Sequence, residues 1–236
     1  MSIEPIIILS LAPIVFGLLI SISKRHAPAD FHKMLLRAWF FGLIAFIPAI
    51  FLIWLASVLD LTTIRSLKRT LFYSFFVVGF FEEFIKYIFL NIFVSSKKVC
   101  NSPTRIILAS ITLSLGFILV ENVYFILTNG GGHFSLLEGF LSVPGHIIFG
   151  IMMGFFVSFG KFRKSNFIFP AIGLGTATFF HGLFQFAIFS NDNTLLAITL
   201  GLSLVIAILL FKKALHTTRE DIDHIDRDKL EEELRG

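Results

Sequence analysis

Two adjacent glutamates and a lysine interrupt an apolar stretch, VVGFFEEFIKYIFL, that runs from Val77 to Leu90. On a helix, Lys86 follows Glu83 by three residues and Glu82 by four, so its ammonium group can reach both carboxylates on one face. An ionised side chain at the centre of a membrane helix costs about 2.5–3.5 kcal/mol to insert, whereas each Leu, Ile, Phe or Val returns only about 0.3–0.6 kcal/mol. We therefore predict that this face turns toward protein or a water pocket, where Lys86 neutralises one carboxylate and leaves the other free to take a proton.

Three later apolar stretches also carry polar residues of the types used in catalysis. They are LVENVYFIL with Glu121, Asn122 and Tyr124, LSVPGHIIFGIMMG with His146, and FFHGLFQF with His181 and Gln185 at i, i+4 spacing. A carboxylate shielded from bulk water can act as general base toward a water molecule. A histidine can donate to the oxyanion of a tetrahedral intermediate or protonate the leaving amine. Together these types predict hydrolysis of a peptide bond inside a membrane.

A covalent nucleophile is not evident in this set, because the single cysteine, Cys100, falls in an expected loop and no serine is clearly paired with a base. A divalent metal such as zinc is the rival device. Catalytic zinc takes two histidines and a carboxylate, and the candidates are Glu82, Glu83, Glu121, His146 and His181. The chain lacks the H-E-x-x-H pattern of helical zinc proteases, so no short motif favours the metal.

The composition excludes an ordinary soluble domain. Of the 236 residues, 56% are hydrophobic, 31 are Phe and only 15% are charged, whereas soluble domains carry about 25% charged residues. The net charge of +4 comes from basic residues that flank apolar stretches, so membrane topology explains it better than nucleic-acid binding. The first apolar run begins after Glu4 and reaches about Ser23, which predicts a spanning helix instead of a cleaved signal.

Seven apolar stretches are long enough to span the hydrocarbon as helices. They predict an all-α polytopic membrane protein whose helices lie at about 5–23, 38–59, 71–94, 106–127, 140–160, 168–189 and 194–211. We expect a single transmembrane domain over residues 1–211, with its catalytic core at about 71–190, and a charged cytoplasmic tail over 212–236.

The basic residues predict the orientation of this bundle. The segments 24–37, 95–105, 161–167 and 212–236 hold 16 of the 20 Lys and Arg, which places the N-terminus outside and the C-terminus in the cytoplasm. Segment 60–70 is an exception, with three basic residues on the outer side; it is either an amphipathic interfacial stretch or a sign that the second span is misplaced. In this orientation the ionisable groups of four helices lie in the outer half of the membrane, at depths that agree to within about 8 Å. No structural need is served by so many costly groups at one depth, so we predict that they form one site.

Four short motifs follow one another on successive expected helices: EEFIK at 82–86, ENVY at 121–124, HIIFG at 146–150 and HGLFQ at 181–185. This ordered set resembles the PrsW family of bacterial intramembrane proteases, which is related to the CAAX prenyl endopeptidases and to bacteriocin-processing and immunity proteins. The resemblance covers residues 71–190, about half of the chain.

The resemblance implies that Glu82 and Glu83 are the catalytic glutamate pair and that His146 and His181 complete the site. It implies a protein of the bacterial cytoplasmic membrane that cuts a membrane-anchored protein, such as an anti-sigma factor, on its outer side. It leaves open whether the enzyme uses a metal or glutamate alone. Gln185 departs from the Asn that CAAX-type relatives carry after the last histidine, which puts the oxyanion-binding detail in doubt.

The leading hypothesis is an intramembrane endopeptidase acting on a single-pass membrane protein, in contact with lipid and not with nucleic acid. Glu82 or Glu83 activates water, and the remaining carboxylate and Lys86 tune it. Both histidines stabilise the transition state, while the supporting residues are Glu121, Asn122, Tyr124 and Gln185. Two alternatives stay open: a non-catalytic membrane binding protein of the same fold, and a proton-coupled transporter. The nearly bare cytoplasmic halves of the helices count against the transporter.

Overall fold

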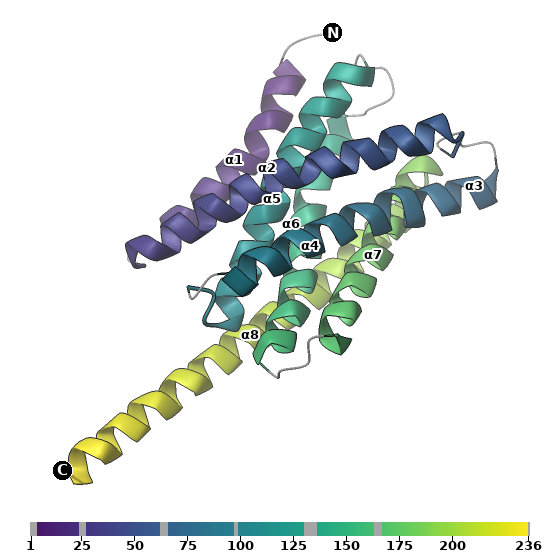
Figure 1. The fold of residues 1–236 in the computed structure, drawn as a ribbon. Helices are drawn as coiled ribbons and strands as arrows, with labels where there is room; N and C mark the ends of the chain where they lie inside the picture. Colours follow the sequence, from purple (N-terminus) through teal and green to yellow (C-terminus); the bar gives the residue numbers. More distant parts are fainter. Residues whose placement is uncertain are drawn as a thin grey trace.

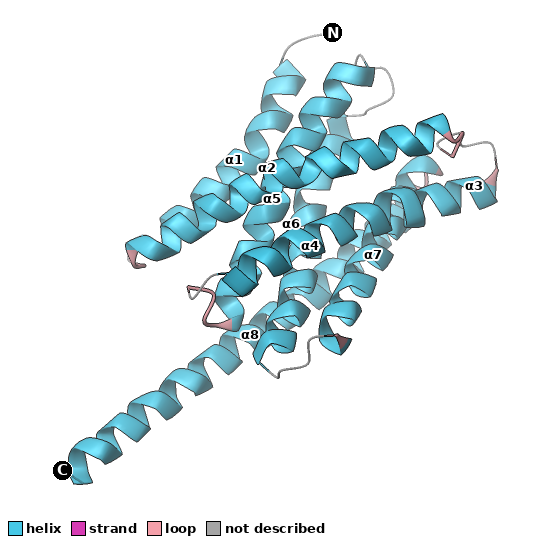
Figure 2. Ribbon diagram, in the orientation of Figure 1, coloured by secondary structure: helices cyan, strands magenta, loops and turns pink. Residues whose placement is uncertain are grey.

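A computed structural model describes residues 4–23, 27–61, 66–96, 99–129, 136–162 and 167–235, and in these ranges the regular elements are all helices (Figure 2). The predicted all-α fold class is confirmed. The helices are α1 (Glu4–Ser23), α2 (Ala29–Val58), α3 (Leu67–Phe72), the π-helix η1 (Tyr73–Phe80), α4 (Phe81–Ser96), α5 (Pro103–Asn129), α6 (Leu136–Phe162), α7 (Ile168–Phe189) and α8 (Asn193–Arg235).

The helices match the seven predicted spans, because α3, η1 and α4 follow one another without a break. Within the described residues, five helices are long and apolar enough to cross a membrane: α2, α5, α6, α7 and the part of α8 up to Thr217. In α1, residues Ala12–Ile22 form a shorter apolar helical segment. The chain is therefore a multi-pass helical membrane protein.

Helix α5 lies at the centre of the bundle, between α2 on one side and α6 on the other (Figure 1). Every residue from Ile106 to Ile118 is buried. Glycines let the neighbouring backbones approach, as is usual between membrane helices. A Cβ on Gly154 of α6 would lie 2.8 Å from Ile107 Cα, and one on Gly42 of α2 would collide with the Leu113 carbonyl of α5.

Helix α7 packs against α6, η1 and α8, so it closes the bundle on the side away from α1 and α2 (Figure 1). Its bounds agree with the predicted span at 168–189. Helix α8 continues past the predicted end at residue 211 as one helix to Arg235, and its C-terminal part projects away from the bundle (Figure 1).

The start of the second span was predicted too late. Helix α2 begins at Ala29, whereas residues up to Arg37 were expected to form a loop. Hydropathy marks where a helix lies in lipid and not where the helix begins. The polar residues Asp30, His32 and Lys33 lower the hydropathy of the first turns of α2, so these turns were not recognised as helical. The predicted end near residue 59 is correct, so the basic segment that follows does not come from a misplaced span.

Part of that segment, 62–65 with Arg65, lies outside the described residues. At its start, Asp60 has a positive φ of 53°, and its carboxylate pairs with exposed Arg69 at 3.3 Å. The Ser66 hydroxyl then accepts a hydrogen bond from the Arg69 backbone N–H at 3.4 Å and so caps α3. An exposed, capped turn thus leads directly into the helix that carries the glutamates.

The helix that carries the glutamates is widened just before them. Residues Tyr73–Phe80 form a π-helix, which ends at Phe81 immediately before Glu82. π-Helical turns are rare and occur frequently at functional sites. Neither hydropathy nor side-chain spacing predicted this segment.

Candidate active site

Four helices bring six ionisable side chains together inside the bundle. Helix α4 supplies Glu82, Glu83 and Lys86, while α5 supplies Glu121, α6 supplies His146 and α7 supplies His181. All six are buried, with at most 7% of any residue exposed. The fold therefore brings these groups together in one cluster, as predicted. Their proximity does not by itself assign their roles.

Glu83 is the carboxylate with the most partners in this cluster. Its Oε1 accepts a hydrogen bond from Lys86 Nζ at 2.8 Å and another from His181 Nδ1 at 2.9 Å. One oxygen thus joins a cation of its own helix to a histidine of α7. This arrangement fixes Glu83 and orients the His181 ring.

Glu82 differs sharply, although it is the adjacent residue. Its Oε2 is buried and has no hydrogen-bond partner among the described residues. The closest basic atoms are Lys86 Nζ at 3.6 Å and His181 Nε2 at 3.9 Å, both beyond hydrogen-bond distance. An unsatisfied buried acceptor costs about 1–3 kcal/mol, and more when it is charged, so this oxygen is the one left to receive a ligand or a water molecule.

The hydrogen-bond partners assign opposite tautomers to the two histidines. His181 faces the carboxylate of Glu83 through Nδ1, so this nitrogen carries the proton and Nε2 is left as an acceptor. His146 faces Lys86 through Nδ1 at 3.2 Å, and an ammonium group can only donate. His146 therefore accepts at Nδ1 and carries its proton on Nε2.

Glu121 lies on the far side of His146. Its Oε2 is 3.7 Å from His146 Nε2 and has no hydrogen-bond partner among the described residues. The proton of His146 thus points toward a second carboxylate that is not held by a hydrogen bond. Glu82 and Glu121 are thus the two carboxylates of the cluster that each have a buried oxygen without a hydrogen-bond partner among the described residues.

Aromatic rings form part of the walls, and the sequence analysis did not single them out. Lys86 Nζ lies 4.2 Å from the centroid of the Phe117 ring, a cation–π contact that adds to its pairing with the glutamates. Phe149 stacks on the His181 ring, with centroids 5.0 Å apart. The available signal was helical spacing, because Phe117 precedes Glu121 by four residues and Phe149 follows His146 by three.

The three neutral residues predicted to support the site differ in their surroundings. Asn122 is buried, and neither its amide nitrogen nor its amide oxygen has a partner among the described residues. Tyr124 is half-buried with its ring 5.7 Å from that of Phe46, on the side toward α2. Gln185 is half-buried, one turn after His181. In the described part of the chain, no hydrogen bond or ion pair joins these three residues to the ionisable cluster.

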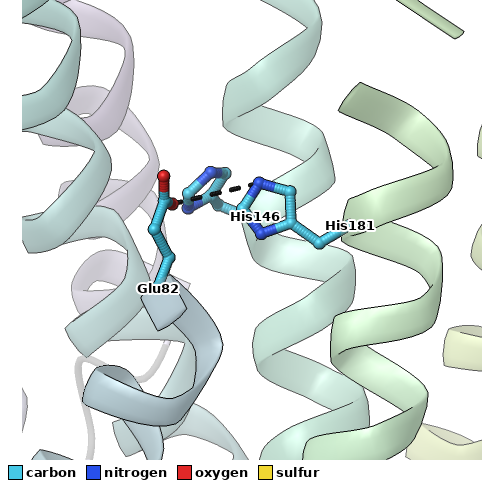
Figure 3. A group of neighbouring side chains, drawn as sticks. All are labelled: Glu82, His146 and His181. Atoms are coloured by element: carbon cyan, nitrogen blue, oxygen red, sulfur yellow. Dashed lines mark ion pairs between the residues drawn. The ribbon is translucent and has the colours of Figure 1, made fainter. Parts of the chain in front are cut away.

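The side chains Glu82, His146 and His181 form a donor set that a divalent metal could use. One ligand atom from each lies within 4.8 Å of the others, and Figure 3 shows the Glu82 carboxylate directed toward the two imidazole rings. Two imidazoles and a carboxylate are a usual complement for catalytic zinc. The bond from His181 to Glu83 leaves Nε2 as a lone-pair donor, as carboxylate partners of metal-binding histidines do.

The donor types fit, and Lys86 sets a condition. Its ammonium group occupies the Nδ1 lone pair of His146, while Nε2 carries a proton. His146 can therefore bind a cation only after the hydrogen bond to Lys86 is released. The metal is thus compatible with the residues present, and it would share the site with a positive charge.

The cluster and the bundle together define a class: a polytopic membrane protein whose helices enclose carboxylates and histidines suited to hydrolysis. A sequence model of the PrsW family intramembrane metalloproteases matches residues 32–212. The chain belongs to this family. It is similar to the protein named Protease PrsW from Oceanobacillus iheyensis, with 30% identity over 156 residues that cover 61% of this chain and 68% of the relative.

Further relatives carry the same name. Protease PrsW from Bacillus subtilis is 26% identical over 162 residues, which cover 68% of this chain and 72% of the relative. Protease PrsW from Clostridioides difficile is 24% identical over 187 residues, which cover 76% and 77%. No solved structure matches the chain at a significant level. The relationship to CAAX endopeptidases stays a prediction.

Proposed function

We propose that this chain is an intramembrane endopeptidase that hydrolyses a peptide bond of a membrane-anchored protein within the outer half of the membrane. The observation that carries the proposal is the buried Glu82 Oε2, which lies beside two histidines and has no hydrogen-bond partner within the described ranges. Membership of a protease family supports the same reading. Burying a carboxylate oxygen without a hydrogen bond costs free energy. A general base needs such an oxygen, because the oxygen has to be free to accept a proton from water.

Glu82 is the proposed general base. A water molecule bound by its free Oε2 attacks the carbonyl carbon of the scissile bond while Glu82 removes one of the water protons. Glu83 is less suited to this task, because its Oε1 is already held by Lys86 and His181. Glu83 instead acts as a positioning residue that orients His181.

The histidines have complementary proposed roles that follow from their tautomers. His146 carries its proton on Nε2 and can donate a hydrogen bond to the oxyanion of the tetrahedral intermediate. His181 presents the Nε2 lone pair and can hold the attacking water by accepting its second proton in a hydrogen bond. When the carbon–nitrogen bond breaks, Glu82 returns its proton to the leaving amine, and a new carboxyl group and a new amine result.

A metal would be held by Glu82, His146 and His181, and it would supply a Lewis acid that polarises the carbonyl group. Lys86 then has to leave His146, as described above. The two versions make different predictions for purified protein. If a metal takes part, a chelator abolishes cleavage and added zinc restores it; if the enzyme depends on glutamate alone, cleavage continues in the chelator.

The proposed substrate is a single-pass membrane protein, with an anti-sigma-factor type as one candidate. A substrate segment has to pass between helices, because all six ionisable residues are buried in the bundle. A helical substrate also has to unwind locally, because its peptide carbonyls are otherwise hydrogen-bonded within the helix. Both conditions favour a short segment near the outer end of a spanning helix.

The experiment is co-expression of this chain with a library of tagged single-pass membrane proteins, followed by mass spectrometry of truncated products. Glu82→Gln replaces the proposed base by a side chain of the same shape. Asp60→Asn makes the same chemical change at an exposed acidic residue remote from the site, and it serves as the matched control. A fragment that forms with the unaltered chain and with Asp60→Asn, but not with Glu82→Gln, supports the proposal and gives the cut relative to the membrane.

The other outcomes separate the remaining functions. Fragments that persist with Glu82→Gln rule out the proposed base. Captured partners without any fragment favour a non-catalytic binding protein of the same fold. Proton-dependent flux in liposomes, without cleavage or capture, favours the transporter.

A further inference from the structure

The helices that carry Glu83 and His181 touch each other through two glycines. A Cβ added to Gly79 in η1 would lie 2.9 Å from the Gly182 backbone nitrogen and 3.0 Å from Gly182 Cα. A Cβ added to Gly182 in α7 would lie 2.9 Å from Phe75 Cα and 2.8 Å from Phe75 Cγ. At both positions a side chain would meet the backbone of the other helix, so only glycine permits this approach.

This contact lies directly beside the candidate site. Gly182 follows His181, and Gly79 precedes Glu83 by four residues, which is about one helical turn. The 2.9 Å hydrogen bond between Glu83 Oε1 and His181 Nδ1 joins the same two helical segments, η1–α4 and α7. The distance between these segments at the glycines therefore governs the length of this hydrogen bond.

The π-helix holds Gly79 in place from its own side. The Ser74 carbonyl oxygen, five residues earlier, would lie 3.0 Å from a Cβ on Gly79, so the glycine is enclosed by its own widened turn as well. On the outer face, rings at successive i, i+4 positions form a ladder with centroids 5.2, 5.6 and 5.4 Å apart, in which the first pair is tilted and the other two are stacked; the rings are Phe72, Phe76, Phe80 and Phe84. The segment is thus supported on its outer face by this ladder and on its inner face by α7.

We propose that Gly79 and Gly182 are positioning residues of this site: their backbone contact sets the distance between η1–α4 and α7, and so the hydrogen bond from His181 to Glu83. For its effect on cleavage the inference rests on the proposed function. For its effect on His181 it rests on the geometry alone.

The size of the displacement makes the inference testable. Carbon atoms in ordinary contact lie about 3.5 Å apart or more, so an alanine at either position has to move the helices by about 0.6 Å. Hydrogen bonds of this type have an accessible range of about 2.7–3.2 Å. A bond of 2.9 Å that lengthens by this amount is lost. Because a 1 Å misplacement of catalytic groups can cost about 100-fold in rate, we expect kcat to fall by roughly 10- to 100-fold.

Helix α7 offers two matched controls for Gly182→Ala. A Cβ on Gly173 would be crowded to a similar degree, at 2.8 Å from Phe156 Cβ, but against α6 and about 12 Å along the helix from His181. A Cβ on Gly175 would have no atom within 4 Å. Gly173→Ala therefore measures the effect of crowding between helices away from the site. Gly175→Ala measures the effect of the glycine-to-alanine change without crowding.

The first readout is cleavage, normalised to the amount of folded protein. We expect Gly182→Ala to lower kcat with little change in KM, Gly173→Ala to lower thermal stability but not kcat, and Gly175→Ala to alter neither. The double variant Gly182→Ala, Phe75→Ala removes the ring atoms at 2.6 and 2.8 Å from the new Cβ but leaves Phe75 Cα at 2.9 Å, so it should not restore the full kcat. Equal losses of kcat in Gly182→Ala and Gly173→Ala, or full recovery of kcat in the folded double variant, would overturn the proposal.

The second readout does not need a substrate. Nitrogen-15 NMR of histidine-labelled protein reports the protonation and bonding of each ring nitrogen, and a His181→Gln variant assigns the His181 signals. We expect these signals to move in Gly182→Ala, or in the double variant if the single one does not fold, and to stay in place in Gly173→Ala and Gly175→Ala. Unchanged His181 signals would refute the positioning role. A chain that cleaves nothing but shows the expected shifts would refute the proposed function and leave the positioning role standing.

Discussion

The two ends of α5 differ in how their polar groups are treated. In the buried run Ile106–Ile118 the hydroxyl of Thr112 donates to the Leu108 carbonyl at 2.7 Å, so its hydrogen bond is made within the helix. One turn beyond this run, Glu121 Oε2 and the side-chain amide of Asn122 have no hydrogen-bond partner in the part of the chain that the structure describes. In the first region the Thr112 hydroxyl is buried with its hydrogen bond made. In the second region, polar groups are buried without hydrogen bonds, which costs free energy that selection for stability alone would have removed.

The same contrast runs along α4. Phe93 near its C-terminal end is fully buried in the large apolar cluster, whereas Glu82 and Glu83 at its start lie in the ionic cluster. These ends are about 16 Å apart along the helix. We call the region of the large apolar cluster the apolar half of the bundle and the region of the ionic cluster the polar half. The difference teaches that the apolar half holds the helices together and so keeps the residues of the polar half in place.

The largest effect is expected from Glu82→Gln. Removing a general base lowers the rate by roughly 10²- to 10⁴-fold. A neutral amide also relieves the cost of burying a carboxylate whose Oε2 accepts no hydrogen bond from the described residues, so the free energy of unfolding should not fall. Cleavage and thermal unfolding of the purified variant measure the two effects. A variant that is inactive because it is unfolded would contradict this division between the two halves.

Lys86→Met should act mainly on stability. It leaves Glu83 without its cation partner in a buried site, and breaking such a pair costs about 3–5 kcal/mol. The matched control is Lys68→Met, which removes the same charge from an exposed position in α3. Unfolding in detergent should distinguish the two variants, and equal stability would mean that the ionic cluster is not held as described.

Phe93→Ala tests the apolar half. Removal of about 100 Å³ of side chain leaves a cavity that costs roughly 2 kcal/mol, since burial from lipid adds little beyond packing. We expect a lower unfolding temperature and an unchanged kcat per folded molecule. A drop in kcat in the folded variant would show that the two halves are coupled.

The smallest effect on the protein is expected from two cysteine substitutions that test which half faces outward. Thr194→Cys lies at an exposed position at the start of α8, on the predicted outer side, and Phe167→Cys lies at an exposed position on the predicted cytoplasmic side. A membrane-impermeant maleimide on intact cells should label the first and not the second. The native Cys100 is fully buried and should add little background. The reverse pattern would invert the orientation.

Most of the bundle could be predicted because lipid imposes length and composition on a spanning helix. The convergence of Glu121, His146 and His181 was predictable for the same reason, since each side chain is costly at its depth. The roles of Glu82 and Glu83 were not separable, because i, i+3 and i, i+4 spacing both reach Lys86. Packing against α7 makes their surroundings different, because His181 lies at hydrogen-bond distance from Glu83 and not from Glu82.

The π-helix could not be predicted, because its i→i+5 hydrogen bonds leave no mark in hydropathy. The glycine contact was also missed, since Gly79 and Gly182 are far apart in sequence and ordinary in composition. What the sequence conceals is the register between helices, which depends on atoms from both partners.

The complete burial of the six ionisable residues has a kinetic consequence. If the reactive groups are sealed in the resting state, each turnover begins with an opening of the bundle, and this step belongs to the slow motions of packed helices. The observed rate then depends on how often the bundle opens as well as on how fast the bond breaks. Membrane thickness and temperature should therefore change turnover through the opening step as well as through the chemistry.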